Sequence, residues 1–167
     1  MPKLPLVALD TNVLLDLAKA DEKVIDCIET IRARVKNAHF VVLPTVVQEL
    51  MGIADDHERD ESELAIVALS SILEWGFQPV NCIPVGNGIV EETGRKLRNA
   101  GLIPDDQIHD SFIVAEAALA DATMLVSNDA HIRDINPTQL KIELDRCDLG
   151  CPLIASPRKI VRDFFRK

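Results

Sequence analysis

Two acidic residues of the chain come directly after predicted buried strands. Asp10 ends the apolar run 6–9, and Asp129 follows the run 123–127 after one asparagine. The carboxyl ends of parallel strands lie along one edge of a sheet, and ligands bind in the crevice at that edge. We therefore expect Asp10 and Asp129 to lie at the same edge.

Two further acids lie on predicted helices that begin near this edge. Glu49 falls in the first turn of a helix that Thr45 opens with a capping-box pattern. Asp110 falls in the first turns of a helix predicted over 106–120. This helix leads into the next strand, so it joins the cluster if it starts at the carboxyl edge of the sheet.

Four carboxylates brought together without a counter-charge repel one another, which raises some of their pKa values. A divalent cation removes this conflict, and oxygen ligands without His or Cys favour Mg²⁺ or Mn²⁺ over zinc. Such cations promote the hydrolysis of phosphodiesters. Taken alone, Glu49 is better explained as a helix-terminal acid and Asp110 as an exposed acid, so the joint pattern carries the prediction.

The elements that must position these acids alternate between strand-like and helical patterns. The candidate strands are 6–9, 40–43, 80–85, 123–127, 141–144 and 153–155. The candidate helices are 24–35, one from Thr45, 62–75, 89–101, 106–120 and one from Pro157. Continuously apolar strands between helices indicate a parallel sheet covered on both faces, and we expect one α/β domain over residues 1–167.

Composition sets broad limits on function. The chain has 167 residues, 47% of them hydrophobic and 27% charged, as in globular proteins with an apolar core. We find no targeting segment and no run of roughly 20 apolar residues that would span a membrane, so we expect a soluble cytoplasmic protein. The net charge of −9 argues against general adhesion to polyanions, and each basic cluster, such as 95–98, is expected to be a solvated helix face.

Four stretches of the chain resemble, in order and placement, the motifs of PIN-domain nucleases. The resemblance extends from about Leu6 to the final helix, and the four together are far more specific than any one alone. The stretches are VALDTNV at 7–13, VLPTVVQEL at 42–50, DSFIVA at 110–115 and LVSND at 125–129.

The resemblance implies a three-layer α/β/α sandwich around a five-stranded parallel sheet. It also implies RNA cleavage dependent on Mg²⁺ or Mn²⁺, with Asp10, Glu49, Asp110 and Asp129 as the catalytic, metal-binding acids. A further implication is that nearby polar residues orient these carboxylates. These positions are Thr11 and Ser127, and with less weight Asn12 and Asn128.

Partners follow from the same resemblance. The substrate would be single-stranded or structured RNA. Small PIN proteins of the VapC-like branch are often the toxin of a toxin–antitoxin pair, which implies a homodimer and a small antitoxin protein as partner.

Several features leave alternatives open. Asp106 stands one helical turn before Asp110 on the predicted helix, and is either an additional ligand or the true third acid. His109 and His131 flank motif acids, and we expect each at the surface or beside the substrate rather than on the metal. The acidic segment 55–63 and the extended tail depart from the most compact members of the family.

Two other functions compete with the nuclease. A catalytically silent PIN-like scaffold would bind RNA or protein, although a degenerate site should have lost some of its acids. A phosphatase with Asp10 as nucleophile is disfavoured, because haloacid-dehalogenase-like enzymes carry a second Asp where this chain has Asn12.

Overall fold

The computed structural model describes residues 3–81 and 84–165. Its five strands form one sheet in the order β3-β2-β1-β4-β5, and every neighbouring pair runs parallel. The predicted α/β class with a parallel sheet is confirmed. The strands are β1 (Leu6–Leu9), β2 (His39–Val42), β3 (Gln78–Pro79), β4 (Met124–Val126) and β5 (Leu153–Ala155).

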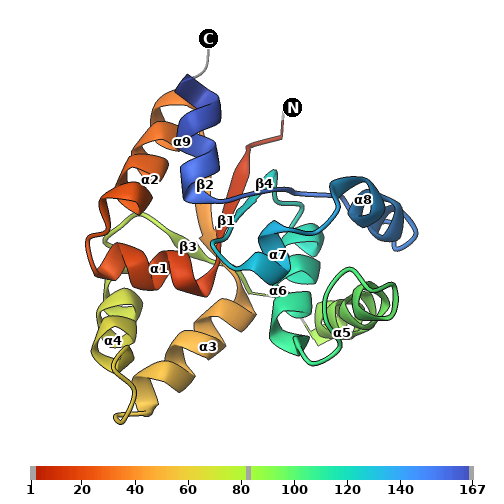
Figure 1. Cartoon of the computed structure of the whole chain (residues 1–167), viewed down its shortest axis with the longest axis horizontal. Helices are drawn as coiled ribbons and strands as arrows, with labels where there is room; N and C mark the ends of the chain where they lie inside the picture. Colours follow the sequence, from red (N-terminus) through yellow and green to blue (C-terminus); the bar gives the residue numbers. More distant parts are fainter. Residues whose placement is uncertain (1–2, 82–83, 166–167) are drawn as a thin grey trace.

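Helices cover both faces of the sheet, which gives the three layers expected. Figure 1 shows α1, α2, α4 and α9 on one side and α5, α6 and α8 on the other. The helices of the described residues are α1 (Thr11–Ala18), α2 (Glu22–Arg34), α3 (Pro44–Asp55), α4 (Ser62–Ser71), α5 (Pro84–Asn99), α6 (Ile108–Leu119), α7 (Ala130–Arg133), α8 (Pro137–Asp145) and α9 (Pro157–Phe165).

The strand order reverses between β1 and β4. From β1 the chain adds β2 and then β3 on one side, and it then returns to place β4 on the other side of β1. The crossovers on the two sides of β1 therefore leave in opposite directions. In sheets of this kind ligands bind at the carboxyl ends of the two strands at the reversal, which here are β1 and β4. Asp10 and Asp129 come after these two strands.

The centre of the sheet is fully buried. The exposed fraction is 0% for Leu9 of β1 and for both Leu125 and Val126 of β4. Continuous burial replaces the alternation of a half-exposed strand because helices pack on both faces. The backbone at the ends of these strands is therefore held by the core on both sides.

Two of the predicted strands are wrong. The strand expected at 80–85 lies earlier, at Gln78–Pro79, and α5 begins at Pro84, where proline fits the first helical turn; residues 82–83 lie outside the described part. The strand expected at 141–144 is part of α8. Its short alternation of polar and apolar residues mimics a strand, but Asn136 caps the helix by accepting from the amides of Thr138 and Gln139.

Helix starts also differ from the predictions. The N-cap of α3 is Leu43 and Pro44 is its first residue, so Thr45 lies inside the helix and no capping box forms. The helix expected from Asp106 begins at Ile108. Among the described residues, no helix is both long enough and apolar enough to cross a membrane.

Candidate active site

Asp10 is the most buried of the four predicted acids, with 3% of its surface exposed. It follows β1 directly and caps α1, and its Oδ1 accepts a hydrogen bond of 2.7 Å from the amide of Thr11. Its Oδ2 accepts a hydrogen bond of 2.5 Å from the hydroxyl of Ser127. An acid between a strand and a helix thus serves as an N-cap and remains fixed at the reversal of the strand order.

Ser127 joins Asp10 to Asp129 across the reversal in strand order. While its hydroxyl donates to Asp10, its Oγ accepts from the amide of Asp129 at 3.0 Å. Asp129 in turn caps α7, because its Oδ1 accepts from the amide of His131 at 2.8 Å. The fully buried serine therefore fixes both strand-end acids relative to each other.

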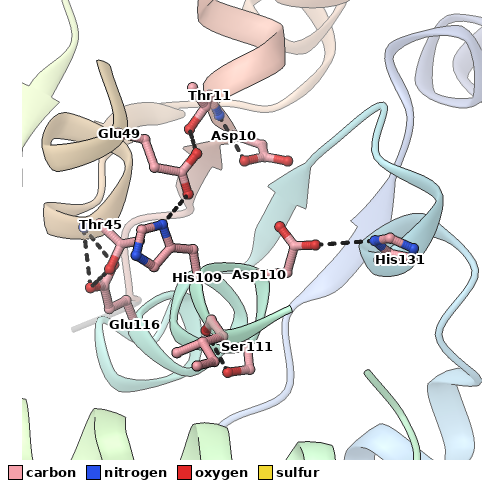
Figure 2. A network of polar contacts seen from close by, with 10 residues as sticks. Asp10, Thr11, Thr45, Glu49, His109, Asp110, Ser111, Glu116 and His131 are labelled. Atoms are coloured by element: carbon pink, nitrogen blue, oxygen red, sulfur yellow. Dashed lines mark hydrogen bonds and ion pairs between the residues drawn. The ribbon is translucent and has the colours of Figure 1, made fainter. Parts of the chain in front are cut away.

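Glu49 reaches the site from α3. The hydroxyl of Thr11 donates to its Oε2 at 2.8 Å, and His109 Nδ1 lies 3.7 Å from its Oε1. Figure 2 shows that the carboxylates of Asp10, Glu49 and Asp110 point toward a common space between the ends of β1 and β4. Residues from three separate parts of the sequence therefore meet here.

Asp110 is the third residue of α6 and has an unsatisfied oxygen. Its Oδ2 is buried and has no hydrogen-bond partner among the described residues. His131 Nδ1 lies 3.4 Å from it, at ion-pair distance but without the geometry of a hydrogen bond (Figure 2). A buried carboxylate oxygen without a partner is costly unless a ligand completes it.

Burial, and to a lesser extent the neighbouring carboxylates, raises the pKa values of three of these acids. Burial, with contributions from Glu49 and Asp110, raises the pKa of Asp10 to about 7. The hydrogen bonds from Ser127 and Thr11 act in the opposite direction and lower this pKa. Burial and the charges of Asp129 and Glu49 raise the pKa of Asp110 to about 6. The pKa of Glu49 is also raised, chiefly by burial. Crowded oxygens of this kind, one of them unpartnered, fit a divalent cation.

Of the polar residues predicted to orient the acids, Thr11 and Ser127 contact them directly. Asn128 instead donates from its backbone to Asn12 Oδ1 and from its side chain to Asp16 Oδ2, both at 3.3 Å. The structure places Asp106 in the exposed turn before α6, outside the helix on which its alignment with Asp110 depended.

Glu116 is a buried acid beside the site that sequence reasoning missed. It lies on α6 with 5% of its surface exposed, and it accepts hydrogen bonds from the amide and the hydroxyl of Thr45 on α3. Its signal was an acid inside the otherwise apolar segment 112–120. Because Glu49 lies one helical turn after Thr45, this contact joins α6 to the part of α3 that carries Glu49.

Fold and site together define an α/β protein with an acidic centre at the reversal of a parallel sheet. Residues 7–136 match the PIN domain family, and the chain belongs to that family. PIN domains are generally nucleases. A search of curated protein sequences gave no match.

Solved structures of similar fold cover nearly the whole chain. VapBC-1 from nontypeable Haemophilus influenzae matches with a TM-score of 0.59 and 17% identity over 92% of this chain and 99% of that one. VapBC2 from Rickettsia felis, bound to a DNA fragment from its promoter, matches at 0.58 and 18% over 90% and 98%. FitAcB from Neisseria gonorrhoeae matches at 0.52 and 15% over 90% and 97%. At these identities the likeness shows the fold.

Proposed function

We propose that this protein is a metal-dependent endoribonuclease that hydrolyses RNA phosphodiester bonds. Asp10, Glu49, Asp110 and Asp129 would hold Mg²⁺ or Mn²⁺. The observation that carries the proposal is the convergence of Asp10, Glu49 and Asp110, all with raised pKa values, around the unpartnered Oδ2 of Asp110. Among the described residues, His109 and His131 face these acids at ion-pair distance, but no Lys or Arg does. A purely structural cluster would be expected to contain such permanent counter-charges.

The chain's own residues prepare the acids for this role. Ser127 and Thr11 donate to Asp10 and Glu49, and hydrogen bonds to a carboxylate favour its charged form. They also fix the direction of the oxygens, as partners of ligand residues do in metal sites. A divalent cation bound there would polarise the scissile phosphate and activate water for the attack.

RNA as substrate rests on the resemblance of the motifs to PIN-domain nucleases. Helices α5 and α6 also offer a cation beside an aromatic ring. Arg98 of α5 donates to Ser111 Oγ at 2.5 Å, and Ser111 follows Asp110 directly. Arg98 also lies over the ring of Phe112, 5.9 Å from its centroid. A guanidinium beside an aromatic ring suits both the phosphate and the base of single-stranded or structured RNA.

Isothermal titration with Mn²⁺ tests the site itself. We expect the wild-type protein to bind Mn²⁺. The Asp10→Asn variant keeps the size of the side chain and its capacity for hydrogen bonds, and it should bind Mn²⁺ at least about tenfold more weakly. Failure of the wild type to bind Mn²⁺ would contradict the nuclease proposal and favour a catalytically silent scaffold.

We further propose that the protein is the toxin of a toxin–antitoxin pair and forms a homodimer. The support is the fold shared with VapBC-1 and VapBC2, together with the VapC-like motifs. A short gene encoding a DNA-binding protein immediately upstream should yield a partner that co-purifies with this chain. Light scattering of the isolated chain should give twice the mass of 18.4 kDa; a monomer that captures no neighbouring gene product would contradict this part.

A further inference from the structure

His131 faces two of the acids at once. Its Nδ1 lies 3.4 Å from Asp110 Oδ2 and 3.6 Å from Asp129 Oδ1. One donor atom from each of these three residues lies within 4.8 Å of the other two. Three donors so close together can share one cation with little movement of their side chains.

The start of α7 builds this arrangement. Asp129 caps the helix by accepting from the amide of His131, so the two residues are held in one turn. The side chain of His131 is 46% exposed, which leaves the imidazole free to adjust its position. Asp110, which faces His131 from α6, has a side chain that is 14% exposed and carries the buried oxygen without a hydrogen bond.

His109 provides a contrast within the same site. Its Nδ1 lies 3.7 Å from a single carboxylate, that of Glu49, and its side chain is 60% exposed. It is not part of the three-residue group formed by Asp110, Asp129 and His131. Figure 2 shows the two imidazoles on opposite sides of the carboxylate cluster.

We propose that His131 binds the same cation as Asp110 and Asp129, so that the site has mixed nitrogen and oxygen ligands. This inference rests on the proposed metal-dependent function and deepens it. Imidazole suits first-row transition metals, whereas Mg²⁺ keeps oxygen ligands and water. The site therefore selects Mn²⁺ or a related transition cation over Mg²⁺. The proposal departs from the expectation that His131 lies at the surface or beside the substrate, because the turn at the start of α7 holds His131 next to Asp129.

Pulsed electron paramagnetic resonance on the full chain loaded with Mn²⁺ tests the contact directly. We expect the ¹⁴N modulation of a coordinated imidazole in the wild type and its loss in His131→Gln. The matched control is His109→Gln, which should retain the signal. The His131→Asp variant restores an oxygen ligand, so it should bind Mn²⁺ without the nitrogen signal.

Competition between the two cations gives an independent readout. The preference of the wild type for Mn²⁺ over Mg²⁺ should fall by about tenfold or more in both variants of His131 and remain within about twofold in His109→Gln. Bound Mn²⁺ without nitrogen modulation in the wild type, or with modulation that persists in His131→Gln, overturns the role of His131 but leaves the nuclease proposal intact. A wild type that binds neither cation overturns both.

Discussion

The candidate site holds its acids in different ways on its strand side, at the end of β1, and on its helix side, at the start of α6. On the strand side, Asp10 has both carboxylate oxygens occupied, by the amide of Thr11 and the hydroxyl of Ser127. On the helix side, Asp110 has a buried oxygen with no hydrogen bond, and its neighbour is a half-exposed imidazole. Burial raises the pKa of both carboxyls, but only the first is rigidly oriented by the fold.

This difference indicates a division of roles. The strand side is a pre-formed platform whose geometry depends on backbone ends and Ser127. If the proposed cation binds, the helix side would complete its ligand set only with that cation, and the identity of the metal would be selected there. Substitutions on the two sides should therefore have different effects. On the strand side they should disturb the positions of the carboxylates, and on the helix side they should alter the preference for one metal over another.

Asp10→Asn should have the largest effect. It keeps the size of the side chain but removes the most buried negative charge of the site. We expect RNA cleavage to fall by roughly 10³-fold or more while the protein remains folded, because the catalytic acids act as a unit. Steady-state cleavage of a labelled RNA, with circular dichroism as the control for folding, measures this. Activity within a few fold of the wild type would exclude Asp10 from catalysis.

The stability of the metal-free protein should fall as pH rises. Burial raises the pKa of Asp10 from 3.8 to about 7 and that of Asp110 from 3.8 to about 6, so the folded state holds protons more tightly than the unfolded chain. The stabilisation by these protons is complete below the unfolded pKa and is lost as pH rises through the folded values. We expect the contribution of Asp10 to be on the order of a few kcal/mol.

Thermal melts in chelator at about pH 5 and about pH 8 measure this dependence. Asp10→Asn is the matched variant, and its melting temperature should fall less between the two pH values than that of the wild type. Added Mn²⁺ should stabilise the wild type more at the higher pH, where the acids are ionised. Equal pH dependence in the two proteins would contradict the raised pKa of Asp10.

Ser127→Ala should separate the two sides. It removes the donor to Asp10 and the acceptor for the amide of Asp129 together, so we expect cleavage to fall by about 10–100-fold. Thr11→Val removes only the hydrogen bond to Glu49 and should cost less. Cleavage rates of both variants at saturating Mn²⁺ decide the order. A larger loss in Thr11→Val would place the rigid platform at Glu49 instead.

Glu116→Ala should act through stability more than through chemistry. The amide and hydroxyl of Thr45 would lose their buried partner, which costs about 1–3 kcal/mol of unfolding free energy. Glu116→Gln keeps an acceptor oxygen and should lose less. Denaturant unfolding of the two variants measures the difference. An equal and negligible loss in both would show that this contact does not hold α3 in place.

The smallest effect is expected at Asp106. It lies in the exposed turn before α6, so Asp106→Asn should change cleavage and Mn²⁺ affinity by less than about twofold. The matched variant is Asp110→Asn, which removes the unpartnered carboxylate and should lose both. A large loss in Asp106→Asn would exchange the roles of the two acids.

Sequence reasoning succeeds best where the backbone is buried on both sides. The strands before Asp10 and Asp129 are continuously apolar. A polar residue that follows such a buried strand must lie at the edge of the sheet. The predicted placement of both acids follows from this local pattern. The motifs of the family resemblance then indicated Glu49 and Asp110 as the remaining acids.

Contacts between helices distant in sequence could not be predicted in this way. Thr45 looked like a helix cap because its pattern with Gln48 is local, but Pro44 starts the helix and Thr45 bonds to Glu116 instead, 71 residues away. The approach of His131 to Asp110 likewise depends on how α7 and α6 pack. Hydrophobic periodicity contains no information about such polar contacts.

Cleavage of a defined panel of single-stranded and hairpin RNAs tests the central claim most directly. The wild type should cut with Mn²⁺ and stop cutting when chelator is added, and Asp10→Asn should give no product under the same conditions. Cleavage that persists in chelator, or equal cleavage by Asp10→Asn, would contradict a metal-dependent ribonuclease at this site.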